Sequence, residues 1–403
     1  MLIVQKFGGT SVGDLDRIQN VANRVQKSVQ DGHQVVVVVS AMSGETNKLV
    51  GYAEHFSKTP SPAEVDMLLS SGERVTASLM SIALNEMGNP AVAMTGRQAG
   101  IVTTSKHTKA RIEEINPERM QEALDNGKIV VVAGFQGVNE KGVITTLGRG
   151  GSDLSAVALA GALGADLCEI YTDVEGIYTT DPRIEPHARK LDKISYDEML
   201  ELASLGAKVL QNRSVEMAKK LNVNLVTRSS FSDAEGTLIT KEENIMEKPL
   251  VSGIALDRNQ ARISLSGVVD RPGIASDIFS ALSEADVNID MIIQTSSKEG
   301  NTSVDFTVPS GELVDAKNVV KKFIDNKEIK EVSYDEGICK VSIVGVGMKS
   351  HTGVAAKAFR TMADENININ MISTSEIKVS MIITEKYAEL AVRTLHASYD
   401  LDK

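Results

Sequence analysis

The chain has little cysteine, no tryptophan and no long apolar run among its 403 residues. Cys168 and Cys339 stand far apart among apolar neighbours, so we expect two buried free thiols rather than a disulfide or metal ligands. No segment approaches the roughly 18 consecutive apolar residues of a membrane-spanning helix. The first residues also lack the apolar stretch of a signal peptide. These absences predict a cytoplasmic protein without a membrane partner.

Basic residues are fewer than acidic ones, with 43 Lys and Arg against 54 Asp and Glu, which gives a formal net charge of −11. This acidity argues against nucleic acid or an anionic membrane as the main partner, although one cationic pocket remains compatible with it. The six histidines show no metal-ligand spacing, so we predict no metal site built by protein side chains. The Gly-x-Ser-x-Gly elbow is absent, which leaves hydrolase chemistry without support.

Residues 1–245 alternate buried strands with amphipathic helices, and the length of the chain predicts two or three domains. The expected strands are near-continuously apolar and cover residues 2–5, 35–39, 129–133 and 167–172. The predicted buried helix faces are Ile18, Val21, Val25 and Val29, and Val75, Leu79 and Ile82 before a stop at Gly88. The alternation predicts an α/β fold with a mainly parallel sheet, whose ligands bind at the carboxyl ends of the strands.

The region after the charged segment 241–248 contains an internal repeat. Residues 263–267 (ISLSG) match residues 341–345 (VSIVG) at an offset of 78. Gly273, Asn288 and Met291 then match Gly353, Asn368 and Met371 at an offset of 80. This pattern predicts two small α+β modules of one design.

A first glycine-rich cluster, Lys6-Phe7-Gly8-Gly9-Thr10-Ser11, follows the first predicted strand. Adjacent glycines allow close backbone approach, and the next helix offers free N–H groups to phosphate. Lys6 would neutralise phosphate oxygens during transfer. The cluster is not a Walker sequence, and taken alone it also suits a structural turn.

A second cluster, Gly148-Arg149-Gly150-Gly151-Ser152-Asp153, precedes a predicted helix. Arg149 suits a carboxylate, whereas Asp153 has two open interpretations, a helix cap or a partner for an ammonium group or for the lysine. Glu73, in a segment (SSGER, 70–74) expected to open a helix, either compensates the helix dipole or binds a cation. Together, Glu73 and Arg149 would recognise a zwitterion.

A polar loop after the strand at 167–172, YTDVEGIYTTDPR at 171–183, could hold a purine and ribose. Tyr178 in this loop has packing as its alternative role. Lys208, at the start of a later helical stretch, suits phosphate, with a surface lysine as the alternative.

These motifs together resemble the aspartokinases, enzymes with the amino-acid-kinase fold that phosphorylate aspartate. The resemblance covers the whole chain in order and rests on KFGGTSV at 6–12, VVVVVSAM at 35–42, SGER at 71–74, GRGGSD at 148–153, YTDVEGIYTTDPR at 171–183 and GAKVLQNRSVEMA at 206–218. It implies a catalytic domain at 1–245 and two ACT (ferredoxin-like) modules at 246–330 and 331–403. It also implies that the strand near 249–256 joins the second module.

The resemblance further implies ATP and L-aspartate as substrates, with Mg²⁺ held mainly through the ATP phosphates and Lys6, Glu73 and Asp153 as catalytic residues. The implied aspartate contacts are Thr46, Glu73, Arg149 and Ser152. The implied ATP contacts are Lys6, Phe7, Gly8, Gly9, Ser40, Thr172, Asp173, Tyr178, Arg183, Lys208 and Val209.

For regulation, the resemblance implies feedback inhibition by lysine, threonine or both, and homo-oligomers formed through ACT pairing. The implied effector positions are Asp270, Gly273, Ile274, Ala275, Asn288, Asp290 and Gln294 in the first module, and Thr352, Gly353, Val354 and Ala355 in the second. Thr352 stands where relatives often have proline, and Asn370 where they often have glutamate, so the second slot differs from the family pattern. Met246 matches an internal start that gives some relatives a shorter regulatory subunit.

Two alternatives remain. A glutamate kinase would share the fold, but SGER, GRGGSD and the double ACT region disfavour it. A catalytically dead sensor is disfavoured because Lys6, Glu73, Arg149 and Asp153 are all present.

Overall fold

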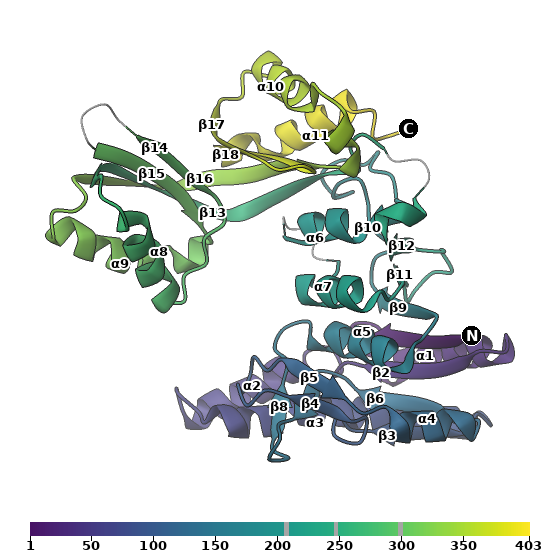
Figure 1. The fold of residues 1–403 in the computed structure, drawn as a ribbon. Coiled ribbons are helices and arrows are strands. Elements are labelled where there is room, and N and C mark those ends of the chain that lie inside the picture. Colours follow the sequence, from purple (N-terminus) through teal and green to yellow (C-terminus); the bar gives the residue numbers. More distant parts are fainter. Residues whose placement is uncertain (205–208, 246–248, 297–300) are drawn as a thin grey trace. The chain divides into compact units, whose positions relative to one another are not determined.

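The computed structural model describes residues 1–204, 209–245, 249–296 and 301–403, which form two compact units (Figure 1). The first unit comprises the described residues of Met1–Ile177, Lys190–Ser204 and Lys208–Glu247. The second comprises Tyr178–Arg189 and the described residues of Lys248–Lys403. Within these ranges no helix is both long and apolar enough to cross a membrane.

The first unit holds two sheets. The strands of the larger sheet are β1 (Leu2–Phe7), β2 (Gln34–Val39), β3 (Ala91–Met94), β6 (Ile129–Ala133), β9 (Leu167–Thr172), β10 (Lys193–Ser195), β11 (Leu225–Ser229) and β12 (Thr237–Thr240). Those of the smaller are β4 (Ile101–Thr103), β5 (Ile112–Ile115), β7 (Gln136–Val138) and β8 (Ile144–Thr146). The helices are α1 (Leu15–Gln30), α2 (Glu45–Phe56), α3 (Pro62–Glu86), α4 (Glu118–Asp125), α5 (Gly151–Leu163), α6 (Tyr196–Ser204), α7 (Asn212–Leu221) and the 3₁₀ turn η1 (Glu242–Asn244).

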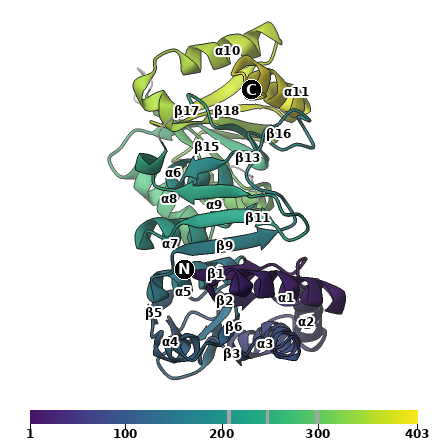
Figure 2. The same ribbon diagram turned by 90° about the vertical axis from the view of Figure 1, so that its right-hand side faces the viewer.

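The larger sheet has the order β10-β12-β11-β9-β1-β2-β6-β3, and every pair is parallel except β11 with β12. Helices α1 and α3 cover one face, and α4 and α5 cover the other (Figure 2). Because both faces are covered, strand β2 is a run of buried valines from Val35 to Val39. The predicted mainly parallel α/β sheet is therefore confirmed, and the four expected strands correspond to β1, β2, β6 and β9.

The face predicted to be buried on the long helix α3 is wrong. Val75 and Ile82 are 54% and 66% exposed, whereas Thr76, Met80 and Leu84 are buried. The inward face combines apolar side chains such as Met80 and Leu84 with small and polar ones. The polar groups Asp66 and Glu73 contact Thr146, the last residue of β8, and Ala41, just after β2. Hydrophobic periodicity therefore pointed to the solvent side.

The second unit is built on a single six-stranded sheet of order β14-β15-β13-β16-β18-β17. Its strands are β13 (Gly253–Val269), β14 (Ile292–Ser296), β15 (Asn301–Val308), β16 (Glu331–Val344), β17 (Ile369–Thr374) and β18 (Lys378–Thr384). Its helices are α8 (Ile274–Glu284), α9 (Leu313–Asp325), α10 (Val354–Asp364) and α11 (Ala388–Ser398), with 3₁₀ turns η2 (Ser310–Glu312), η3 (Val346–Ser350) and η4 (Glu385–Tyr387).

The two copies of the repeat share their two longest strands, β13 and β16. The first half of β13 pairs with the second half of β16, from Gly253 opposite Val344 to Asp257 opposite Lys340. The second half of β13 pairs with the first half of β16, and Gln260 lies opposite Ile338 at the crossover. Gln260 and Ile338 occupy equivalent positions in the repeat, so the two copies meet about a local twofold relationship. The expected pair of α+β modules is therefore present, joined in one sheet.

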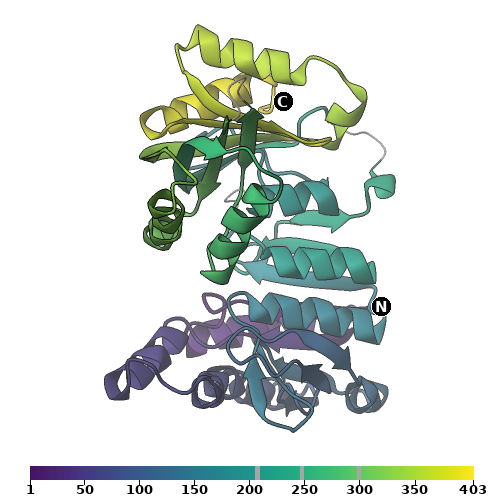
Figure 3. The ribbon, with the colours of Figure 1, turned by 60° about the vertical axis from the view of Figure 1, so that its left-hand side comes forward.

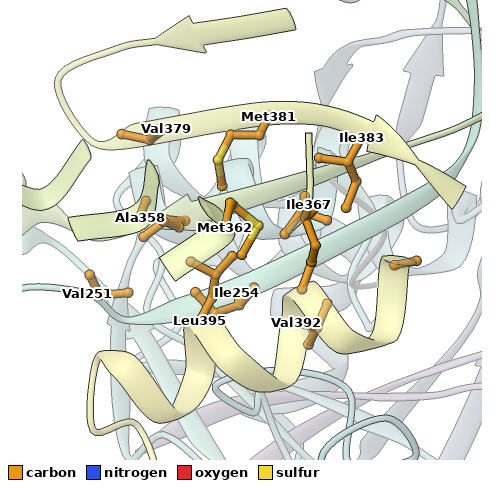
Figure 4. Close-up of a cluster of buried hydrophobic side chains, with 14 of the residues drawn as sticks. Val251, Ile254, Ala358, Met362, Ile367, Val379, Met381, Ile383, Val392 and Leu395 are labelled. Carbon is orange, nitrogen blue, oxygen red and sulfur yellow. The ribbon is translucent and has the colours of Figure 1, made fainter. Parts of the chain in front are cut away.

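Each copy has its own apolar core. Helices α8 and α9 enclose one core with β13 and β15. The other core lies under α10 and α11, which sit side by side on the sheet (Figure 3). Figure 4 shows this second core, where Met362 of α10 and Leu395 of α11 meet Met381 of β18 and Ile254 of β13.

Candidate functional site

The centre of the site is an ion pair between Lys6 and Asp153. Lys6 is the next-to-last residue of β1, opposite Val38 of β2 and Ile170 of β9, and is 8% exposed. Its Nζ lies 2.6 Å from Oδ1 of Asp153 in the first turn of α5. Gly150 is the N-cap of α5, so Asp153 holds the lysine rather than capping the helix.

The Gly8-Gly9 pair lets the chain pass close to Lys6 and to the end of β2. A Cβ at Gly8 would lie 3.3 Å from Lys6 Nζ, and one at Gly9 would lie 3.0 Å from the carbonyl oxygen of Ala41. The neighbouring Phe7 is fully buried and stacks on Tyr171, with ring centroids 4.6 Å apart. Only the backbone of Phe7 is therefore available to a ligand at this loop.

Glu73 lies in the middle of α3, as its twelfth residue, so the expectation that residues 70–74 open a helix is wrong. The helix begins at Pro62, a residue type favoured in the first turn. Because Glu73 lies far from this end, it does not compensate the helix dipole. Gly72 allows α3 to pass close to Ala41, because a Cβ at this position would lie only 2.8 Å from the Ala41 Cβ.

The Glu73 carboxylate is buried and only half satisfied. Its Oε1 accepts a hydrogen bond of 3.1 Å from the Ala41 N–H, while its Oε2 has no hydrogen-bond partner among the described residues. Burial raises the pKa of Glu73 to about 7. A buried carboxylate oxygen without a donor suits a cationic group brought by a ligand.

Arg149 stands exposed in the loop between β8 and α5, flanked by Gly148 and Gly150 at φ 79° and 70°. Two side chains at the start of α7, for which the sequence analysis predicted no role, bind the backbone of this loop. Gln211 Nε2 donates to the carbonyl of Arg149, and Arg213 Nη1 donates to the carbonyl of Leu147 at 2.6 Å. A positive charge in the first turn of a helix interacts unfavourably with the helix dipole. The position of Arg213 could therefore have indicated in the sequence that its side chain binds a group outside α7.

Other predicted site residues of the first unit lie at the ends of strands or in the first turns of helices. Ser40 follows β2 and donates its N–H to the Phe7 carbonyl at 3.1 Å. Thr172 ends β9, and its Oγ1 accepts from the Val174 N–H at 3.0 Å, with Asp173 exposed beside it. Ser152 is 6% exposed in α5. Thr46 is partly exposed in the first turn of α2.

The remaining nucleotide-site predictions fall elsewhere. Tyr178 and Arg183 belong to the second unit, where the Arg183 guanidinium pairs with Asp181 at 2.7 Å. Lys208 lies outside the described residues, and Val209 follows it in a turn. The roles of these four residues stay predictions.

Among the predicted effector positions of the first module, some side chains are exposed and others bind neighbouring residues. Asp270 is exposed, whereas Asp290 pairs with Lys340, a buried lysine of β16. Asn288 donates to the Glu312 carboxylate from its backbone N–H at 2.6 Å and from Nδ2 at 3.0 Å. Gln294 Nε2 donates to Thr302 Oγ1 at 3.4 Å, Ala275 is partly buried, and Ile274 lies in the core.

The second loop repeats the backbone of the first but not its charge. Gly353 has a φ of 97° against 95° at Gly273, and each starts a helix. Val354 is buried like its equivalent Ile274, Ala355 is partly buried like Ala275, and Thr352 is exposed. Asn370 replaces Asp290 at the equivalent position, and its Oδ1 accepts from Asn368 Nδ2 at 3.2 Å. The ion pair of the first copy therefore has no counterpart here.

Across the described ranges, no three or more His, Cys, Asp and Glu side chains gather as they do in a metal site. Both described cysteines are buried and free, as expected.

Comparison with known proteins gives matches along the whole chain. The model of the amino acid kinase family matches residues 1–228, and that of the ACT domain matches residues 263–323 and 341–399. An aspartokinase of Helicobacter pylori strain J99 is 59% identical over 407 residues, covering 100% of both chains.

Two crystal structures of E. coli aspartokinase III, each 29% identical, cover 99% of both chains. The complex with aspartate and ADP (R-state) has a TM-score of 0.82, and the complex with lysine and aspartate (T-state) one of 0.80. The chain belongs to the aspartokinases, kinases that join an amino-acid-kinase fold to ACT domains.

Proposed function

We propose that the chain transfers the γ-phosphoryl group of ATP to the β-carboxylate of L-aspartate, giving 4-phospho-L-aspartate. This reaction would be the first step toward lysine, threonine and methionine. The observation that carries the proposal is the full-length match to aspartokinase III, which was crystallised with aspartate and ADP. The Lys6–Asp153 pair at the carboxyl end of β1 provides chemistry suited to phosphoryl transfer.

Substrate recognition rests on two opposite charges carried by separate elements. Glu73 on α3 receives the aspartate ammonium, which supplies the missing partner of Oε2. Arg149 on the β8–α5 loop holds a carboxylate through its planar fork of donors. Thr46 and Ser152 add hydroxyl contacts. The two charges together select an amino acid over a simple dicarboxylate.

Phosphoryl transfer then requires alignment and charge neutralisation more than proton transfer. The β-carboxylate of aspartate is ionised at pH 7, so no general base is needed. The Lys6 ammonium neutralises the oxygens of the transferred group, and Asp153 fixes its direction at 2.6 Å.

The oxygen groups beside the carboxyl end of β1 suit a hard cation that takes most of its ligands from ATP and water. The Asp153 carboxylate and the buried Ser152 hydroxyl are oxygen groups of the type Mg²⁺ prefers, and no carboxylate cage gathers among the described residues. When bound, Mg²⁺ supplies further neutralisation of phosphate charge.

The nucleotide site combines the Lys6–Gly9 segment and Ser40 with Thr172 and Asp173, which all lie at the carboxyl ends of β1, β2 and β9. The resemblance to the aspartokinases also assigns Tyr178, Arg183, Lys208 and Val209 to nucleotide binding, and these assignments stay proposals.

Regulation is proposed to follow binding of lysine, threonine or both to the ACT modules. The T-state structure of the E. coli relative with lysine and aspartate supports this proposal. Inhibition requires an effector that prefers one arrangement of the modules over another. We place the protein in the cytoplasm, as homo-oligomers through ACT pairing, with a shorter regulatory subunit if Met246 also starts translation.

The proposal is tested by measuring ADP formation with a panel of amino acids and trapping the acyl phosphate with hydroxylamine. We expect ADP and hydroxamate to form in equal amounts with aspartate, and at less than about a hundredth of that rate with glutamate. Equal rates with glutamate, or ADP without hydroxamate, would contradict the proposed acceptor.

A further inference from the structure

Asp66 is a fully buried carboxylate of α3 that the proposed chemistry does not use. Its side chain has 0% exposure and lies within hydrogen-bond distance of three residues. Thr146 Oγ1 donates to Oδ1 at 2.5 Å, and the Thr108 N–H contacts both oxygens at 3.0 and 3.1 Å. His107 Nδ1 lies 2.7 Å from Oδ2. Burial of a carboxylate is costly unless it is hydrogen-bonded, and both oxygens of Asp66 have partners.

The donors to Asp66 all belong to segments that shape the Arg149 loop. Thr146 is the last residue of β8, three residues before Arg149. The carbonyl of Thr146 accepts from the Ala110 N–H at 2.9 Å, so the segment at 107–110 runs alongside the loop. The Thr108 carbonyl also lies close to Gly148, where a Cβ would come within 3.0 Å of it. Thr108 itself has a φ of 61°, a conformation that a non-glycine residue adopts at a cost.

The other side of the network is the helix that carries Glu73. Asp66 lies seven residues before Glu73 in α3, two turns or about 10 Å along a rigid helix and on the same face. Both side chains are buried on the inward side of α3. The Asp66 network therefore links the element that bears Glu73 to the loop that bears Arg149.

We propose that Asp66 is a positioning residue that fixes the separation between Glu73 and Arg149 and thereby sets the affinity for the substrate zwitterion. The inference rests on the proposed function, because it assigns these two residues to the ammonium and the carboxylate of one molecule. Two charges on separate elements bind one small ligand well only when their spacing is held.

The lysine side of the site is anchored independently of Asp66. Ser155 Oγ donates to the Gly151 carbonyl at 2.9 Å and accepts from the Phe135 N–H at 3.1 Å, which fixes the start of α5. Asp153 is further held by Lys6. Loosening the Asp66 network should therefore raise the KM for aspartate and leave kcat and the KM for ATP nearly unchanged.

The two neighbouring threonines of β8 provide a matched test. Thr145 and Thr146 are both buried, and each makes one short side-chain hydrogen bond. Thr145 contacts Thr103 Oγ1 at 2.5 Å, whereas Thr146 contacts Asp66. Thr146→Val and Thr145→Val remove the same group from adjacent positions, and Asp66→Ala removes the whole network. Steady-state ADP formation in the full-length chain, with aspartate and ATP varied separately, gives both KM values and kcat, and thermal unfolding gives Tm.

We expect Thr146→Val to raise the KM for aspartate about tenfold and Asp66→Ala by more, with kcat and the KM for ATP changed less than about twofold. Thr145→Val should lower Tm about as much as Thr146→Val and leave the KM for aspartate within about twofold. The proposal is overturned if Thr146→Val keeps the original KM for aspartate, or if Thr145→Val raises it equally. Thr146→Val decides the matter if Asp66→Ala does not fold. Absence of aspartate-dependent ADP formation in the unmodified chain would overturn the proposed function itself, and this inference with it.

Discussion

The two units differ in how many charged side chains they bury. Among the described residues, the first unit buries six side chains of the Asp, Glu, Lys and Arg types, namely Lys6, Asp66, Glu73, Asp153, Glu169 and Glu198. The second unit buries one, Lys340. Because a buried charge must be paired to be tolerated, such groups are concentrated where a fold uses them. The difference fits the proposal that phosphoryl transfer takes place in the first unit and that the second unit binds effectors.

Not every buried charge of the first unit serves the reaction. Glu169 accepts from Gln5 Nε2 at 2.7 Å and from the Tyr171 hydroxyl at 3.1 Å, and it pairs with Arg228 at 3.2 Å. With these partners Glu169 is fully engaged within the protein. Glu73 differs in having one oxygen without a hydrogen-bond partner in the described part of the chain, and Lys6 differs in lying beside a glycine pair. For Glu73, the incomplete hydrogen bonding of the carboxylate, rather than its burial alone, favours a role in ligand binding.

The substitution Lys6→Ala should have the largest effect on activity. It tests most directly whether a buried charge of the first unit takes part in the reaction. We expect kcat to fall by about 10³-fold, because the positive charge aligned with the transferred phosphoryl group is lost. Circular dichroism and Tm should show an intact fold. The exposed Lys58→Ala is the control and should keep full activity. Near-normal turnover in Lys6→Ala would remove the catalytic assignment.

The substitution Glu73→Gln should act on substrate affinity. The amide keeps an acceptor for the Ala41 N–H but cannot neutralise an ammonium group. We expect the KM for aspartate to rise about a hundredfold, with a change of less than about threefold in the KM for ATP. Steady-state kinetics with each substrate varied would show this. Equal changes in both KM values would mean that Glu73 supports the fold rather than the ligand.

The pH dependence of aspartate binding follows from the raised pKa of Glu73, about 7. Below this pH the carboxyl is protonated in the free enzyme and cannot pair with an ammonium group. The KM for aspartate should therefore rise about tenfold as the pH falls from 8 to 6. The profile should flatten in Glu73→Gln. A flat profile in the unmodified chain would show that Glu73 stays ionised throughout this range.

The smallest effect on turnover is expected from Asp270→Ala in the second unit. This exposed loop residue lies outside the first unit, so uninhibited kcat should change by less than about twofold. The concentration of lysine or threonine that halves activity should rise about tenfold, because a proposed effector contact is lost. The matched variant at the equivalent position of the second copy is Ser350→Ala. Inhibition unchanged in Asp270→Ala would exclude this loop from the effector site.

The sequence predicted those parts of the fold that depend on local pattern. The valine run of β2 has no polar position because helices cover both faces, and this was visible in the residues themselves. The repeat likewise predicted that Gly273 and Gly353 are equivalent, and both precede equivalent helices with nearly the same φ.

Other features depend on partners distant in the chain. The Asp66 network joins residues 41, 42 and 80 positions away, and no local pattern marks Asp66 as buried. The same reason explains the error on α3. Its inward face mixes apolar residues with polar ones, whose partners lie far away in sequence, so apolar periodicity selected Val75 and Ile82 on the wrong side.

The most direct test of the whole account is an aspartate kinase assay of the full chain with lysine and threonine added separately and together. We expect ADP formation that depends on aspartate and that decreases when one or both amino acids are added. Aspartate-independent ADP formation, or aspartate-dependent activity that neither amino acid changes, would contradict the union of a kinase with an amino-acid sensor.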